Sequence, residues 1–168
     1  HGAADGAIIN LPRLKAQRQK GRQMLEDAPV LVQKLTASNQ TLSTVESCTG
    51  GLLFGYLTAV PGASAVLERG FITYSDQAKQ EMVGVTANTL AAFGAVSQQT
   101  AEEMAKGGCQ IARTDLSISL TGIAGPSGGS AEKPVGLVWI SAFRKDGIQQ
   151  TERHLFTGDR KQIRMLAC

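Results

Sequence analysis

The chain has 168 residues, of which 42% are hydrophobic and 18% are charged, a composition typical of a soluble globular domain. A chain of this length buries enough apolar surface to fold without a disulfide framework or a structural metal. The net charge of +3, from 17 basic and 14 acidic residues, argues against a protein built to bind nucleic acid. No apolar run approaches the roughly 18 residues of a membrane span, and no signal-peptide core is present, so we expect a cytoplasmic protein.

The cysteines and histidines do not form a metal-binding pattern. Cys48, Cys109 and Cys168 are far apart, and His1 and His154 are the only histidines. We therefore expect no structural zinc, no disulfide framework and no cofactor.

Basic residues are concentrated near the N-terminus, at Arg13, Lys15, Arg18, Lys20 and Arg22. Such a run could dock on phosphates, but a solvated tail or helix face is the more common explanation. Residues 1–27 are interpreted as an N-terminal extension without an assigned role, and residues 28–168 as one domain.

The first ordered elements are predicted from about residue 27. Asp27 is a candidate N-cap and Pro29 fits the first turn of a helix that ends near Ser38 and has Val30, Leu31 and Leu35 on its apolar face. Residues 41–45 are rich in β-branched side chains and predict a strand. A polar, glycine-rich break at 46–51 leads into a helix at 51–60, which is apolar almost all round and therefore expected to be buried, and Pro61-Gly62 ends it.

A second strand is predicted at 69–74, followed by three helices capped by Ser75, Thr86 and Ser97. The last of these helices spans about 98–112. It places Ala101, Met104, Ala105 and Ile111 on one side, while Gly107-Gly108 permits close packing.

The remaining elements are a strand at 116–121, a glycine-rich loop at 122–130, a hairpin and a final helix. Asp146-Gly147 lies between β-rich runs at 135–143 and 148–156, which is a strong hairpin pattern. Asp159 is expected to cap the last helix, which carries Ile163.

This order predicts an α/β fold: a three-layer α/β/α domain with a mixed, mainly parallel sheet of about five strands that ends in a hairpin. Sites in such sheets form outside the carboxyl ends of the strands. That rule selects the loops at 46–51 and 121–130.

The first loop, Glu46-Ser47-Cys48-Thr49-Gly50-Gly51, contains two types of nucleophile where a strand gives way to a helix. The free N–H groups of a helix N-terminus can hold a phosphate or an oxyanion. The same residue types also serve as ordinary helix caps, so the pattern alone leaves both explanations open.

The loop is not a nucleophile elbow, because it lacks both glycines of G-x-S-x-G. His154 falls in a predicted hairpin strand and is interpreted as an ordinary half-exposed residue. A desolvated lysine can activate a serine instead. Lys79 is the preferred candidate, because it follows the second strand by one helical turn, just after Tyr74 and Ser75.

The second loop carries glycines at 122, 125, 128 and 129, a spacing that fits neither a dinucleotide-binding fingerprint nor a P-loop. It could hold a phosphate or ribose, or serve as a plain connection. Arg160 and Arg164, one turn apart on the last helix, could reach an anionic ligand or form surface ion pairs.

Several motifs together resemble one family. Glu46-Ser47-Cys48-Thr49-Gly50-Gly51, Gly70-Phe71-Ile72-Thr73-Tyr74-Ser75 with Lys79, Thr121-Gly122-Ile123-Ala124-Gly125-Pro126 with Gly128-Gly129, and Gly158-Asp159-Arg160 look like the C-terminal domain of the competence/damage-inducible protein CinA. The match spans about residues 28–166, and the order and spacing of the motifs make it more specific than any one of them.

The resemblance implies an amidohydrolase that converts nicotinamide mononucleotide to nicotinate mononucleotide and ammonia, as a stand-alone homodimer. It implies Ser47 as nucleophile, Lys79 as base and Tyr74 as a supporting hydroxyl. Substrate contacts are expected from Glu46, Thr49, Gly50, Gly51, Thr121, Gly122, Gly125, Gly128, Gly129 and Arg160. In this family the last helix normally continues further than residue 168. The alternative is a nucleotide-binding module without catalysis.

Overall fold

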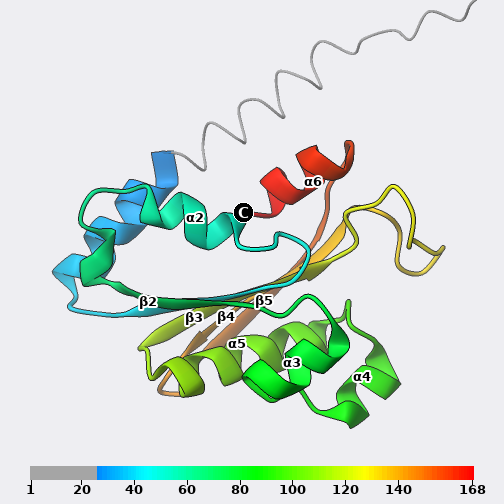
Figure 1. Cartoon of the computed structure of the whole chain (residues 1–168), viewed down its shortest axis with the longest axis horizontal. Helices are drawn as coiled ribbons and strands as arrows, with labels where there is room; N and C mark the ends of the chain where they lie inside the picture. The colour runs from blue at the N-terminus through cyan, green and yellow to red at the C-terminus, as the bar shows by residue number, and fades with distance from the viewer. Residues whose placement is uncertain (1–25) are drawn as a thin grey trace, which may run out of the picture.

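A five-stranded sheet runs through the middle of the protein, with helices on both faces (Figure 1). This computed structural model describes residues 26–168, so the basic run at residues 13–22 lies outside the described part. The strands are β1 (Leu42–Glu46), β2 (Leu67–Ile72), β3 (Leu116–Gly122), β4 (Leu137–Arg144) and β5 (Gln149–Leu155).

The order across the sheet is β2-β1-β3-β4-β5. β1 is parallel to both β2 and β3, whereas β3 with β4 and β4 with β5 are antiparallel. The predicted mixed sheet with its terminal hairpin is confirmed. Because β1 to β3 run the same way, their carboxyl ends meet at one edge of the sheet.

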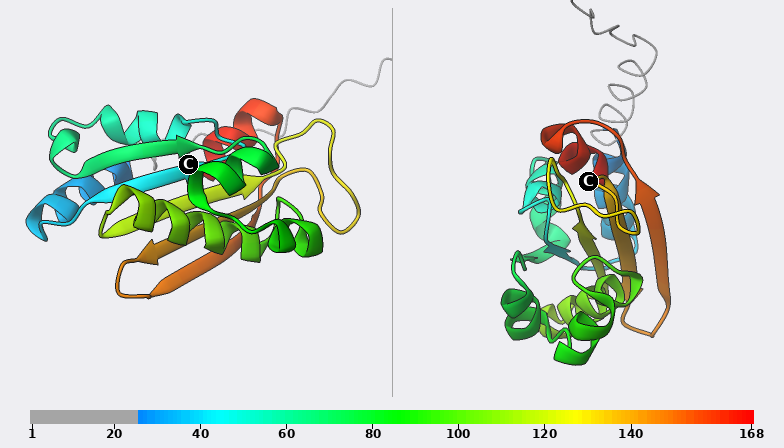
Figure 2. Two further views of the ribbon diagram at one scale, coloured as in Figure 1. Left: turned by 60° about the horizontal axis from the view of Figure 1, so that its bottom comes forward. Right: turned by 90° about the vertical axis from the view of Figure 1, so that its right-hand side faces the viewer.

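Helices form the two outer layers (Figures 1 and 2). One face carries the helix at residues 26–37, α2 (Leu52–Thr58) and α6 (Arg160–Ala167). The other carries α3 (Asp76–Val83), α4 (Ala87–Phe93) and α5 (Gln98–Ala112). A short 3-10 helix, Ala63–Ala65, links α2 to β2. The predicted three-layer arrangement is therefore confirmed.

Four of the five predicted helix caps are confirmed. The side-chain oxygens of Ser75, Thr86, Ser97 and Asp159 each accept a hydrogen bond from the backbone N–H three residues later. These bonds satisfy amide groups that have no partner inside the helix, so each cap fixes where its helix begins.

The first described helix differs from the prediction in two respects. Residue 26 is already helical, so Asp27 lies inside the helix and does not cap it. Val30, expected on the apolar face, is 47% exposed, while Ala28, Val32 and Leu35 are buried. Positions 28, 32 and 35 follow one another at helical spacing, which rotates the buried face away from Val30.

Two further burial predictions are wrong. α2 was expected to be buried all round, but only Leu53 and Leu57 are buried, because the helix lies in the outer layer and presents one side to the sheet. Ile111 of α5 is 46% exposed, since the stripe through Ala101, Met104 and Ala105 faces the sheet.

The second strand starts and ends two residues earlier than predicted, at Leu67–Ile72. It is an edge strand, and its central residues are exposed, so alternation of apolar residues is a weak guide to its bounds. Thr73 and Tyr74 consequently lie just past its carboxyl end.

α5 packs very close to its neighbours through its glycine pair, as predicted. A Cβ at Gly107 would collide with the backbone carbonyl of Val83, and one at Gly108 would collide with the side chain of Val45. Close contact joins α5 to both α3 and β1, and so fixes α3 relative to the sheet edge where β1 ends.

No helix within residues 26–168 is long and apolar enough to cross a membrane. In the same part of the chain, no three His, Cys, Asp or Glu side chains gather in a way that could hold a metal ion.

Candidate active site

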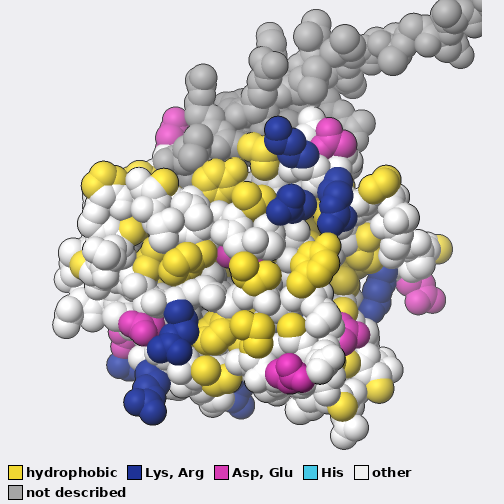
Figure 3. Space-filling view, in the orientation of Figure 1, with side chains coloured by type: hydrophobic (Ala, Val, Ile, Leu, Met, Phe, Trp, Pro, Cys, Tyr) yellow, Lys and Arg dark blue, Asp and Glu magenta, His cyan; other side chains and the backbone are white. Residues whose placement is uncertain are grey.

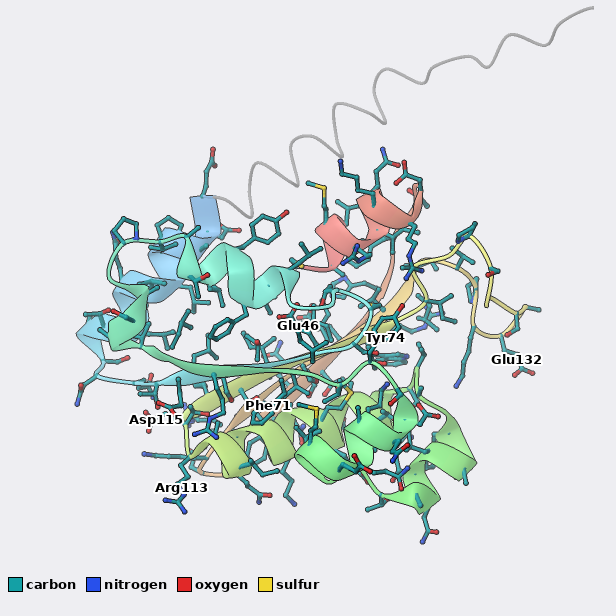
Figure 4. All side chains as sticks on the ribbon, in the orientation of Figure 1. Glu46, Phe71, Tyr74, Arg113, Asp115 and Glu132 are labelled. Atoms are coloured by element: carbon teal, nitrogen blue, oxygen red, sulfur yellow. The ribbon has the colours of Figure 1, made fainter. Side chains whose placement is uncertain are left out.

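The candidate site lies where β1, β2 and β3 end. Ser47 directly follows β1, Tyr74 follows β2, and the glycine loop follows β3. Figure 4 shows Glu46 and Tyr74 at this end of the sheet, while Asp115 and Arg113 lie at the opposite end. The two loops selected from the sequence therefore meet at one edge.

The side chains of Ser47 and Lys79 are in contact. Lys79 Nζ donates hydrogen bonds to Ser47 Oγ at 3.3 Å and to the backbone carbonyl of Thr73 at 3.1 Å. Lys79 is only 1% exposed, although it lies on a short surface helix. Its nearest carboxylate, Asp76, is 3.8 Å away and largely exposed.

Burial favours the neutral form of Lys79. Desolvation lowers the pKa of Lys79 below its ordinary value, and the nearby Asp76 and Cys48 oppose that shift only in part. Burial has the opposite effect on the adjacent thiol and raises the pKa of Cys48 to about 11. At neutral pH the thiol is protonated and a poor nucleophile, whereas Ser47 touches a candidate base.

Glu46 is fully buried and holds the start of α2. Its carboxylate accepts hydrogen bonds from the Thr49 hydroxyl at 2.7 Å and from the backbone N–H groups of Leu53 at 2.9 Å and Phe54 at 3.0 Å. A carboxylate at a helix N-terminus satisfies free N–H groups and is stabilised by the helix dipole. The side chains of Glu46 and Thr49 thus shape the loop around Ser47, and their expected contact with substrate stays a prediction.

Arg164 clamps the same loop from α6. Its Nε donates to the carbonyl of Cys48 and its NH2 to the carbonyl of Thr49, both at 3.0 Å. Neither an anionic ligand nor a surface ion pair, the two roles considered from the sequence, is needed to explain this arginine. Because the peptide unit is planar and trans, a Cys48 carbonyl that faces α6 turns the Thr49 N–H away from α6.

Arg160 joins the loops that follow β2 and β3. Its guanidinium donates to the Gly125 carbonyl at 2.7 Å and to the Tyr74 hydroxyl at 3.0 Å. Tyr74 is 62% exposed and so lies at the mouth of the site. Figure 3 shows Lys and Arg side chains gathered at this end of the molecule, beside exposed hydrophobic side chains.

The glycine loop is packed against the segment that leads into β4. A Cβ would lie 2.6 Å from the Val138 side chain at Gly122, 2.5 Å from the Val135 side chain at Gly125, and 2.7 Å from the Val135 backbone at Gly129. Close packing thus explains these three glycines without a ligand. Their expected role toward substrate, like that of Gly128 in the same loop and of Gly50 and Gly51 in the first loop, stays a prediction.

Thr121 is fully buried, and its hydroxyl donates to the carbonyl of Ala95 at 2.7 Å, which ties β3 to the segment between α4 and α5. That bond gives its side chain a partner within the fold, and its expected contact with substrate stays a prediction as well.

The structure therefore brings Ser47 and Lys79 together, and Arg160 and Tyr74 beside them. His154 lies on β5 as a half-exposed residue paired with Glu152, away from these groups, in agreement with its prediction. Sequence reasoning missed two contacts, the hydrogen bond from Lys79 to the Thr73 carbonyl and the bonds from Arg164 to the first loop.

Known proteins are similar to this chain in sequence and in fold. The CinA C-terminal domain model matches residues 25–168. A relative from Escherichia coli K12, "Nicotinamide-nucleotide amidohydrolase PncC", is 49% identical over 135 residues, covering 80% of this chain and 82% of the relative. A protein of the same name from Enterobacter agglomerans is 48% identical over 133 residues, covering 79% of this chain and 81% of the relative.

A solved structure supports the same relationship. The crystal structure of competence/damage inducible protein CihA from Agrobacterium tumefaciens superposes with a TM-score of 0.83 at 45% identity, over 84% of this chain and 87% of that one. The chain belongs to the CinA C-terminal domain family.

Proposed function

We propose that this protein is an amidohydrolase that converts nicotinamide mononucleotide to nicotinate mononucleotide and ammonia, with Ser47 as nucleophile and Lys79 as base. The observation that carries the proposal is the 3.3 Å contact between Lys79 Nζ and Ser47 Oγ, with the amine buried. The names of the relatives in Escherichia coli and Enterobacter agglomerans support the choice of substrate. The reacting domain is residues 28–168.

The reaction starts with a proton transfer. As Ser47 Oγ attacks the carboxamide carbon, its proton passes to Lys79 Nζ and a tetrahedral intermediate forms. When the C–N bond breaks, the same proton goes to the leaving nitrogen, so ammonia departs and an ester of Ser47 remains. Water then attacks the ester while Lys79 takes one of its protons, and Lys79 gives that proton to Ser47 Oγ as the C–O bond to the serine breaks and the carboxylic acid leaves.

Backbone N–H groups of the first loop stabilise the oxyanion. Within residues 26–168, no hydrogen bond uses the amide of Cys48, Thr49 or Gly51 as donor, whereas the Gly50 amide donates to the Ser47 carbonyl at 3.1 Å. Arg164 holds the carbonyls of Cys48 and Thr49, and so fixes the peptide units that carry the amides of Thr49 and Gly50. Donors held in place before the reaction cost little reorganisation as charge develops.

Arg160 and Tyr74 lie on the nucleotide side. The guanidinium of Arg160 is held by Gly125 and Tyr74 at the mouth of the site, where a ribose phosphate joined to the pyridine ring would extend. Family resemblance also supports a cytoplasmic protein that forms a homodimer, and light scattering on the purified protein would test the homodimer.

The deciding experiment measures ammonia release from nicotinamide mononucleotide by the purified protein and two neighbouring variants. We expect Ser47→Ala to abolish turnover and Cys48→Ala to keep most of it, because the buried thiol is protonated and only the serine touches Lys79. Ammonia release by Ser47→Ala but not by Cys48→Ala would make the protein a cysteine hydrolase. Nucleotide binding without any ammonia release would favour the non-catalytic module.

A further inference from the structure

Thr73 and Ser47 occupy the same rung of the parallel ladder. β1 and β2 pair Val45 with Phe71 and Glu46 with Ile72, and the Thr73 N–H donates to the Glu46 carbonyl at 2.8 Å, so the ladder continues one step past both strands. Side chains alternate along a strand. Thr73 therefore shares a face with Phe71, and Ser47 shares it with Val45, on the side where α3 carries Lys79.

The Thr73 hydroxyl is buried and has no partner. Thr73 is 0% exposed, and its Oγ1 is one of two side-chain polar atoms among residues 26–168 that are buried without a hydrogen bond; the other belongs to Ser117. Buried hydroxyls are almost always paired, because an unpaired one loses its bonds to water without compensation. An orphan hydroxyl beside a candidate base therefore requires an explanation.

The Lys79 amine contacts the backbone of the residue that carries this hydroxyl. Its Nζ already donates to the Thr73 carbonyl at 3.1 Å, and the carbonyl and hydroxyl of one threonine are only a few bonds apart. Oγ1 would approach the amine from another staggered χ1 position. The competing acceptor on α3, Asp76, is 3.8 Å away, beyond hydrogen-bond distance.

We infer that Thr73 is a positioning residue that aims the lone pair of Lys79 at Ser47, an inference that rests on the proposed function. A neutral amine has two N–H groups and one lone pair. One N–H is taken by the Thr73 carbonyl and the other by Thr73 Oγ1, which leaves the lone pair for the Ser47 hydroxyl. As the Ser47 O–H bond breaks and a third N–H forms, both acceptors on Thr73 hold the ammonium in place.

The test compares Thr73→Val, which removes the hydroxyl at nearly constant shape, with Thr73→Ser, which keeps it. With nicotinamide mononucleotide, we expect Thr73→Val to lower kcat about ten- to a hundredfold with KM unchanged, from the loss of one charge-assisted bond. Thr73→Ser should restore kcat to within about threefold of the wild type. Thr73→Val should still fold, with a melting temperature close to that of the wild type, because removal of a buried hydroxyl offsets the loss of one hydrogen bond from Lys79.

A titration of the Lys79 amine by NMR, in protein with labelled lysines and without substrate, provides a second readout. Thr73→Val should lower the pKa of Lys79 further, because the ammonium loses an acceptor, while Asp76 and Cys48, the other groups that affect this amine, are unchanged. Wild-type kcat or an unchanged titration in Thr73→Val would overturn the inference. So would failure of that variant to fold, since the hydroxyl would then have a structural partner. If the wild type releases no ammonia, the proposed function fails, and the titration still decides the role of Thr73.

Discussion

A buried lysine without a close ion pair lowers the stability of the folded protein, because its ammonium loses contact with water. Lys79 is 1% exposed, yet its acceptors are a serine hydroxyl and a backbone carbonyl, and its nearest carboxylate lies 3.8 Å away. Neutral acceptors offset less of the desolvation of an ammonium than a close ion pair does. Residues that reduce stability in this way are typical of active sites.

The lowered pKa of Lys79 predicts a pH-dependent rate. Turnover should rise with pH through that pKa, because only the neutral amine accepts the Ser47 proton. Lys79→Arg should be as inactive as Lys79→Ala, since a guanidinium keeps its proton at any working pH. Initial rates of ammonia release across the pH range check both expectations, and near-normal turnover by Lys79→Arg would exclude Lys79 as the base.

The same shift predicts a pH-dependent stability. Between the lowered pKa of folded Lys79 and its ordinary value of 10.5, the unfolded chain binds more protons than the folded protein. The free energy of unfolding therefore rises with pH in this window, and Lys79→Met should remove that part of the slope. Urea denaturation of the wild type and of Lys79→Met at several pH values measures this slope.

The sequence predicted Ser47 and Lys79 at one edge of the sheet, because both follow strands expected to be parallel, but only the folded structure shows their contact. The role of Arg164 was not predictable, because α6 lies more than a hundred positions further along the chain and only the folded structure brings it to the Cys48 carbonyl. Glu46 was predicted in the first loop but is the last residue of β1, and its use as a support for α2 depends on where the α2 N–H groups point.

At the scale of elements, the contact between α5 and α3 controls where Lys79 lies. The backbone of α5 at Gly107 touches the carbonyl of Val83, the last residue of α3. Lys79 is on that same helix, one turn earlier. Because the contact is made by backbone atoms, no rotation of a side chain can relieve a steric clash there.

A pair of glycine variants tests this contact. Gly107→Ala should destabilise the protein by about 1–3 kcal/mol and also lower kcat, because α3 must move away. Gly55→Ala is the matched control: Gly55 lies in α2 with nothing within 4 Å of an added Cβ, so the gain in helix propensity should stabilise the protein by about 0.5–1 kcal/mol. Chemical denaturation together with ammonia release measures both, and equal stability of the two variants would show that α5 adjusts freely.

The starts of the helices capped by Ser75 and Asp159 were predictable, because a capping side chain acts within one turn. Burial was harder to predict. α2 has an apolar sequence on every side, but the sheet can cover only one side of a helix in an outer layer, so the extent of its burial is a tertiary property.

At the scale of the whole molecule, a group of stabilising bonds around Asp115 and the proposed active site lie at opposite ends of the sheet (Figure 4). At the end remote from Ser47, the Asp115 carboxylate accepts from the Thr41 backbone N–H at 2.7 Å and pairs with Lys145. Those bonds fasten the starts of β1 and β3 to the β4–β5 hairpin. Strand order was not predictable from the sequence, because such contacts join segments far apart in the chain.

Asp115→Asn should therefore affect stability but not turnover. The hydrogen bond from Lys145 and that from the Thr41 N–H lower the pKa of Asp115 to about 2 from 3.8. Its stabilising contribution is complete above 3.8 and is lost as pH falls toward 2. At neutral pH the variant should lose about 1–2 kcal/mol of stability and keep its kcat. A kcat that fell with stability would show that the two ends of the sheet are coupled.

The strand pairing that places Ser47 beside Lys79 also decides whether an oxygen or a sulfur atom attacks the substrate. Alternation turns Ser47 toward the amine on one face of the sheet and Cys48 into the apolar layer on the other, where it is 6% exposed. The two nucleophiles differ by one position along the chain. Deleting a single residue from β1 would bring Cys48 to the position that Ser47 holds now. Sulfur would then face the lysine where oxygen does now, so the choice between oxygen and sulfur chemistry rests on the parity of a five-residue strand.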